Sequence, residues 1–207
     1  MQELRPDSAE TVRLLDHVQQ GDRGAMDHLL ARHRGELREF LEHRIDPRMA
    51  ARADPSDVVQ EAQLAVVKRM DDFLRRRPMP FRLWLRKTAY ERLIDLQRHH
   101  LKRTRRSVNQ EVGFPDRSSM LLAGPLLKGA ATPSEEMMAR ELAERTAQAV
   151  ARLPEADREI LLMRHGEAMP FEEIACLLDI APATARKRFG RALIRLQTVL
   201  TDQGLLD

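Results

Sequence analysis

The chain has 207 residues, enough for two small domains, and its composition favours an all-helical protein. Aromatic residues make up only 4%, and β-branched residues are sparse between the turns, which disfavours β-sheets. The formal net charge is only +3, so binding of phosphate would depend on local basic clusters. The single cysteine, Cys176, excludes an intrachain disulfide. The first ten residues are polar, and no apolar run approaches the roughly 18 residues of a membrane span, so we expect a cytoplasmic protein without membrane insertion.

Helical periodicity predicts four helices between about residues 10 and 103. The first stops near Gly21, and the second ends before Asp46. The third begins at Pro55, which suits a first helical turn, after Asp54 as a cap. The fourth begins near Phe81 and ends in a basic run over residues 98–106. The apolar positions expected to pack in these helices include Val12, Leu15, Val18, Met26, Leu29, Leu37, Val58, Ala62, Val66, Met70, Leu85 and Ala89.

Periodicity fails between residues 107 and 131, where glycine, proline, serine and asparagine interrupt short apolar patches. A structureless stretch of this length favours a flexible linker between two domains. Order resumes at Thr132 and Pro133, a capping residue followed by a proline at the first helical position. The apolar side of the helix that follows is predicted to carry Met138, Leu142, Val150 and Leu153.

The C-terminal residues 153–200 have the pattern of a helix-turn-helix with a basic second helix. A tight turn is predicted at residues 179–182. The helix after it carries arginines and a lysine with no acid before Asp202, so we expect their charges to be available to DNA. An ordinary helical hairpin with a solvated basic face is the alternative.

These segments, in this order, resemble the bacterial RNA polymerase sigma factors of the extracytoplasmic-function (ECF) type, in the sigma-70 family. Residues 54–61 are similar to the family's region 2.2, which carries D-L/V-V-Q-E, and residues 81–89 to F-x-x-W-L-x-x-I-A. In the C-terminal half, residues 171–175 resemble Y/S-x-E-I-A and residues 184–188 resemble T-V-K/R-S-R. The resemblance implies two small all-α domains, sigma-2 at residues 1–106 and sigma-4 at residues 135–207, joined by a flexible linker at residues 107–134.

The resemblance also implies a set of binding residues. Asp57, Gln60 and Glu61 are implied to bind core RNA polymerase at the clamp helices of its β′ subunit. For Asp57 the alternative is a favourable interaction with the N-terminal helix dipole. Glu91 stands where the family often has asparagine. Binding of the −10 promoter element is assigned to Arg82, Trp84, Arg86, Lys87, Glu91 and Arg98; simple core packing is the alternative for Trp84.

Binding of the −35 element is assigned to Thr184, Arg186, Lys187, Arg188 and Arg191. We expect Arg186 and Lys187 to read base edges and Arg188 and Arg191 to hold phosphates, while Thr184 could contact phosphate or cap the helix. The partners implied are core RNA polymerase through the β′ clamp helices and the β flap, promoter DNA, and an anti-sigma protein as regulator.

Enzyme motifs are missing from the sequence: it has no P-loop, G-x-S-x-G, H-E-x-x-H or dinucleotide fingerprint. His99 and His100 have no histidine at helical spacing and no cysteine cluster, so no metal site is expected. We therefore expect a protein that is not an enzyme and needs no cofactor. The rival functions are a helix-turn-helix transcription regulator that does not act through core polymerase, which leaves the N-terminal half unexplained, and a protein-binding helical adaptor.

Overall fold

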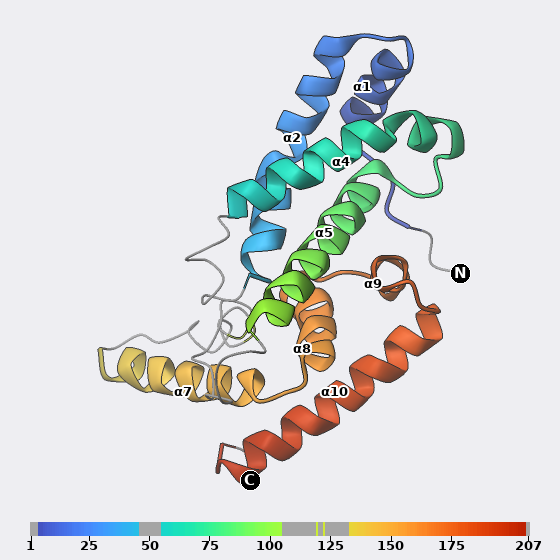
Figure 1. Ribbon diagram of the computed structural model, residues 1–207. Helices are drawn as coiled ribbons and strands as arrows, with labels where there is room; N and C mark the ends of the chain where they lie inside the picture. The colour runs from blue at the N-terminus through green and yellow to red at the C-terminus, as the bar shows by residue number, and fades with distance from the viewer. Residues whose placement is uncertain (1–3, 46–54, 105–118, 120–121, 123–132, 206–207) are drawn as a thin grey trace. The chain divides into compact units, whose positions relative to one another are not determined.

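The computed structural model of the chain describes residues 4–45, 55–104, 119, 122 and 133–205. Its contacts divide the chain into two compact units, Met1–Val108 and Asn109–Asp207. Every regular element in the described ranges is a helix, which confirms the all-α prediction (Figure 1). None of these helices is both long enough and apolar enough to cross a membrane.

The first unit begins with a helical hairpin of α1 (Ala9–Gln19) and α2 (Arg23–Glu42). The side chain of Ser8 caps α1 by accepting a backbone hydrogen bond at 3.2 Å, and Asp22 caps α2 by accepting two. Gly21, with a φ of +88°, makes the turn between the helices, a conformation that favours glycine. The predicted stop of the first helix near Gly21 is confirmed.

Two longer helices, α4 (Pro55–Arg76) and α5 (Phe81–Thr104), complete the first unit. α4 packs against both α2 and α5 (Figure 1). α4 begins at Pro55 and α5 directly after Pro80, as predicted, because proline is tolerated at a helix start but not in its interior. Asp54, the predicted cap of α4, lies outside the described residues.

The start of α5 is capped from a distant part of the chain. The Asp7 carboxylate accepts hydrogen bonds from the backbone amides of Phe81, at 2.6 Å, and Arg82, at 3.1 Å. The Arg82 guanidinium donates to the carbonyl of Arg5 at 2.7 Å. The first turn of α5 has no acid of its own, so Asp7 supplies the negative charge that the helix dipole favours there.

An aromatic cluster fills the core of the first unit. Phe81 is fully buried and makes edge-on contacts with Phe73, at 5.6 Å between ring centroids, and with the His33 ring, at 5.4 Å. Trp84 stacks on Phe73 at 4.4 Å. The cluster therefore joins α2, α4 and α5 through one set of rings.

His33 is a buried titratable group in this core, where its Nε2 is 3.1 Å from the Thr11 hydroxyl. Burial lowers the pKa of the His33 imidazole from its ordinary value of 6.5; Arg32 and Arg86 lower it further, and Glu36 and Asp7 oppose the shift. The folded unit therefore holds His33 neutral at a pH where the unfolded chain begins to protonate it. The contribution of His33 to the stability of the unit is therefore complete above about pH 6.5 and declines as the pH falls below that value.

We expect the first unit to unfold at a lower urea concentration at pH 5 than at pH 7.5, with a smaller difference in His33→Gln. The fluorescence of Trp84, the only tryptophan, reports on this unit alone. His28→Gln, at an exposed position of α2, is the matched control and should keep the pH dependence of the native chain. An equal pH dependence in His33→Gln and the native chain would contradict this prediction.

The second unit consists of α7 (Pro133–Ala151), α8 (Glu155–Leu161), a single π-helical segment η2 (Leu162–Gly166), α9 (Phe171–Leu178) and α10 (Pro182–Asp202). α10 packs against α7, α8 and α9. The predicted start of the first of these helices at Pro133 is confirmed. It lies two residues before the boundary predicted for the C-terminal domain.

The prediction of which residues of α7 pack in the core is wrong for the first half of the helix. Met138 is 69% exposed and Leu142 39% exposed, whereas Ala143 and Ala147 are buried. The packing face of α7 is therefore formed by small side chains, which allow close approach of neighbouring backbones. The larger apolar side chains of its first turns lie on the surface.

One other expected core position is also exposed. Val12 of α1 is 40% exposed, and its neighbour Thr11 is buried in its place, where its hydroxyl meets His33. The prediction that Leu15 packs in the core is confirmed, so the packing face of α1 includes Thr11 and Leu15.

The predicted linker lies largely outside the described residues. Two positions within it are described, Ser119 and Leu122; both are helical, and Ser119 is buried. The basic run at residues 98–106 is helical as far as Thr104.

Candidate nucleic-acid interface

The helix-turn-helix of the second unit is formed by α9 and α10. Asp179 follows α9 in a left-handed conformation, with a φ of 56°, and the Ile180 amide donates to the carbonyl of Ala175 at 3.0 Å. α10 then begins at Pro182, so the predicted turn at residues 179–182 is confirmed.

One face of α10 is exposed and polar. Thr184, Lys187 and Arg191 share it because residues three and four apart are neighbours on a helix, and all three are exposed. Ala185 and Ala192 are buried on the packing side. Ala181 occupies the N-cap position and makes no side-chain hydrogen bond, so the alternative that Thr184 caps this helix is wrong.

The arginines of α10 differ in their partners, which corrects the expectation that all their charges are available. The Arg186 guanidinium donates to the Glu172 carboxylate of α9 at 2.6 Å, and Arg195 pairs with the buried Asp157 of α8. Among the described residues, Lys187, Arg188 and Arg191 have no ion-pair partner. The sequence contains no acid within this part of α10, but the fold brings acids to it from two other helices.

The residues predicted to bind the −10 element lie on α5 but on two different sides of it. Each helical residue turns the chain by about 100°, so Trp84, Lys87, Glu91 and Arg98 share one side. The other side carries Arg82 and Arg86.

Arg82 and Arg86 are occupied by contacts within the first unit. Arg82 binds the carbonyl of Arg5, and Arg86 lies 3.9 Å from the carboxylate of Glu36 and 5.7 Å from the ring centroid of Phe40. These contacts indicate that Arg82 and Arg86 fix the position of α5 within the first unit.

Glu91 is also paired. Its carboxylate lies 3.4 Å from the guanidinium of Arg69 on α4. Trp84 is half-buried, with its ring against Phe73, while Arg98 is exposed. This side of α5 therefore combines a partly accessible aromatic ring with basic side chains. The negative charge of Glu91, on the same side, is neutralised by its ion pair with Arg69.

The predicted docking residues share one exposed face of α4. Asp57, Gln60 and Glu61 are all exposed, and the same face continues with Leu64, 61% exposed, and Val67, 46% exposed. Sequence reasoning missed the two apolar residues. Leu64 and Val67 follow Gln60 at helical spacing and do not belong to the buried face of α4, so the sequence could have indicated them.

A shallow groove of about 230 Å³ lies beside this α4 face. Glu61, Leu64, Ala65 and Lys68 of α4 line it together with Arg92 of α5. It is bordered by acidic, apolar and basic side chains, a mixture that suits another protein surface better than a small apolar ligand.

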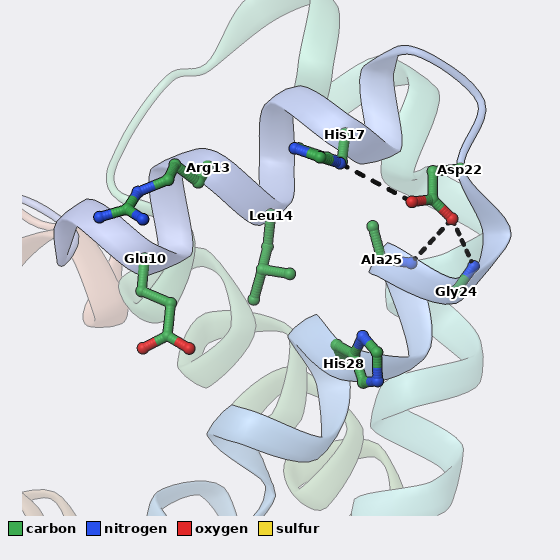
Figure 2. Close-up of a pocket in the computed structure, with 8 residues that line it drawn as sticks. All are labelled: Glu10, Arg13, Leu14, His17, Asp22, Gly24, Ala25 and His28. Carbon is green, nitrogen blue, oxygen red and sulfur yellow. Dashed lines mark hydrogen bonds and ion pairs between the residues drawn. The ribbon is translucent and has the colours of Figure 1, made fainter.

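A larger hollow of about 500 Å³ lies between α1 and α2 and contains none of the predicted site residues. Figure 2 shows Glu10, His17, Asp22 and His28 around it, with His17 3.7 Å from the Asp22 carboxylate. In the part of the chain that the structure describes, no three histidine, cysteine or acidic side chains are grouped so that they could hold a metal ion.

The helical units and their basic helix-turn-helix define a protein of the nucleic-acid-binding class. The family profile described as Sigma-70, region 4 matches residues 143–196, which include all of α9 and α10 as far as Leu196. The ECF RNA polymerase sigma-E factor of Haemophilus influenzae is 28% identical over 180 residues, 86% of this chain and 89% of that protein. The sigma-E factor of Escherichia coli K12 is 27% identical over 86% of this chain and 88% of its own length.

Two solved structures share the fold. The first, CnrH in complex with the cytosolic domain of CnrY, has a TM-score of 0.58 and 22% identity over 94% of this chain and 99% of that one. The second, sigma factor RpoE in complex with the anti-sigma factor NepR from Bartonella quintana, has a TM-score of 0.56 and 17% identity over 84% and 96% of the two chains. The chain is thus homologous to the ECF sigma factors, and its second unit contains a sigma-70 region 4 domain.

Proposed function

We propose that this protein is an ECF-type sigma factor, which binds core RNA polymerase, recognises the −10 and −35 promoter elements and directs transcription initiation in the cytoplasm. The observation that carries this function is the alignment with ECF sigma-E factors over 180 residues, a span longer than either unit. A helix-turn-helix regulator that acts without core polymerase would account for the second unit alone, so it is not favoured. As a sigma factor the protein is an initiation factor and not an enzyme.

Each unit has its own part in this function. Residues 1–106 form the sigma-2 domain, which binds core polymerase and the −10 element. Residues 135–207 form the sigma-4 domain, which binds the −35 element, and residues 107–134 join the two. The match of the region 4 profile to residues 143–196 supports the second assignment.

The exposed face of α4 is the docking surface for core polymerase. Asp57, Gln60 and Glu61 supply acidic and polar groups, and Leu64 and Val67 supply apolar area that water covers in the free protein. Protein interfaces gain most of their stability from such a buried apolar centre inside a polar rim. The β′ clamp helices are the partner that the family resemblance implies, with the β flap as the partner of the sigma-4 domain.

The −10 element is bound by the side of α5 that carries Trp84, Lys87, Glu91 and Arg98. An aromatic ring with basic neighbours suits unpaired bases and their phosphates. Arg82 and Arg86 contribute by positioning α5, because their guanidinium groups bind other parts of the same unit.

An anti-sigma protein is the proposed regulator. The support comes from the fold, which is shared with RpoE of Bartonella quintana in its complex with the anti-sigma factor NepR.

The test of the function is direct. The purified chain is mixed with sigma-free core polymerase, and co-elution and transcript starts on genomic DNA are measured. We expect a stable complex and transcripts that begin at defined sites. DNA binding without association with core polymerase would instead support the regulator.

The exposed face of α10 leads to a further prediction about the −35 element. Alanine substitutions at Arg186, Lys187, Arg188 and Arg191 should separate into two groups. Loss of a base contact, expected at Arg186 and Lys187, relaxes preference at one position by about 1–3 kcal/mol. Loss of a phosphate contact, expected at Arg188 and Arg191, weakens binding to all sequences and flattens the salt dependence. Promoter libraries transcribed by each variant measure the difference, and an unchanged −35 preference in all four would remove α10 from recognition.

A further inference from the structure

Arg186 is held at the border between α9 and α10 by two groups of α9. Its Nη2 donates to Oε1 of Glu172 at 2.6 Å, and its Cζ lies 5.6 Å from the ring centroid of Phe171. The Phe171 ring is itself fixed, with Phe189 edge-on at 5.6 Å and the Arg164 guanidinium at 5.0 Å from its centroid. The Arg186 side chain is thus restrained by an ion pair and by a contact with an aromatic ring.

Glu172 is built into the second unit more firmly than its partner. Its side chain is only 12% exposed, whereas that of Arg186 is 51% exposed. Its second oxygen, Oε2, is buried and has no hydrogen-bond partner among the described residues. The carboxylate is therefore fixed, and it retains an acceptor that can take a second N–H of the same guanidinium.

The pairing has an electrostatic consequence for DNA binding. A free arginine is attracted to any phosphate, and each such contact adds to affinity for all sequences alike. An arginine that is paired with a carboxylate gains little binding energy from a phosphate, because the carboxylate repels the phosphate. The guanidinium has five N–H donors, so it still has donors for the neutral acceptors of a base edge, O6 and N7 of guanine.

We propose that Glu172 is a specificity-determining residue: it orients Arg186 and neutralises it, so that this arginine reads a base edge of the −35 element and does not act as a non-specific phosphate contact. The inference rests on the proposed sigma-factor function and adds a role to a residue outside the recognition helix. Glu172 acts through Arg186 and is a positioning residue.

The test uses Glu172→Gln, which keeps the size of the side chain and removes its charge, assembled with core polymerase. Binding is measured to duplexes that carry a −35 element without a −10 element, at several salt concentrations and with each −35 base pair varied. We expect discrimination at one base pair to fall about tenfold. We also expect affinity for unrelated DNA to rise, and the slope of log affinity against log salt to steepen by about 0.9, the value for one additional phosphate contact.

Two further variants make the result specific. Arg186→Ala should lose discrimination at the same base pair, and the double variant should lose no more than Arg186→Ala alone, because the two residues act as one group. Glu144→Gln removes the same charge from an exposed position of α7 and should leave discrimination unchanged. Circular dichroism melting checks that all variants keep the fold.

The outcomes are distinct. A Glu172→Gln variant with the native base preference overturns the proposal, whether or not its salt slope steepens, because the ion pair would then serve the fold or merely restrain a charge. If the native protein itself shows no −35 preference with core polymerase, the proposed function fails at that step. Loss of preference in Glu172→Gln at the position that Arg186→Ala also relaxes supports the inference.

Discussion

Leu64→Lys is expected to weaken the binding of this protein to core RNA polymerase by tenfold or more, on the order of the effect of losing an interface hot spot. Leu64 is 61% exposed in the free chain and stands in the middle of the proposed docking face of α4. Lysine in its place would bring an unpaired charge into the apolar centre of the interface. The free protein should tolerate the change, because an exposed leucine contributes little to the core.

The polar part of the same face gives a companion variant. Gln60→Ala combined with Glu61→Lys should also weaken binding, since it removes an amide and reverses a charge that faces a basic partner. Affinity for core polymerase is measured by titration with a labelled chain, and helicity by circular dichroism.

Val12→Lys is the matched control for the docking face. Val12 is an apolar residue of α1 in the same unit, 40% exposed and not on α4. It should bind core polymerase as the native chain does. Native affinity in both Leu64→Lys and the double variant would show that α4 does not dock the polymerase.

The second large effect is expected from Trp84→Ala, which should lower the free energy of unfolding of the first unit by about 3 kcal/mol, near the lower end of the range for a large aromatic side chain. The indole stacks on Phe73 at 4.4 Å between centroids and lies 6.0 Å from the centroid of Phe81. Its half-exposed position is the reason for the lower end of the range. Urea unfolding followed by circular dichroism measures the loss.

Trp84→Phe separates the core role of this residue from a role in promoter opening. Phenylalanine keeps an aromatic ring against Phe73, so most of the stability should remain, while a smaller ring offers unpaired bases less area for stacking. Arg98→Ala, at an exposed position on the same side of α5, should leave the stability unchanged. If Trp84→Ala unfolds at the native urea concentration, the indole is not part of the aromatic core.

Much of the helical framework could be predicted because its signals are local. Pro55, Pro133 and Pro182 mark helix starts through their fixed φ and missing N–H, and each of these helices begins there. The turn before α10 was likewise predicted from a short stretch of sequence. Such signals need only neighbouring residues to act.

The face that each helix buries was harder to predict. In α7 the apolar period marks Met138 and Leu142, yet the helix packs through Ala143 and Ala147. Periodicity identifies an apolar stripe, but the size of the gap that the neighbouring helices leave determines which residues fit. That gap is a property of the assembled unit.

The candidate site was predictable in its residue types and less so in its electrostatics. The basic side chains of α10 can be identified in the sequence. The acid that neutralises Arg186 is Glu172, which lies 14 residues earlier in the chain, on the other side of the turn. Similarly, Arg82 and Trp84 are two residues apart and lie on different sides of α5. A residue's charge or ring is local information, whereas its partner depends on the tertiary structure.

The cap on α5 bears on how the first unit is made during synthesis. Asp7 lies 74 residues before Phe81, whose backbone N–H donates a hydrogen bond to the Asp7 carboxylate. Asp7 therefore stays without these partners during synthesis until α5 has been made. Because domains generally fold as units during translation, the contact between Asp7 and the start of α5 forms as a late step in the folding of the first unit.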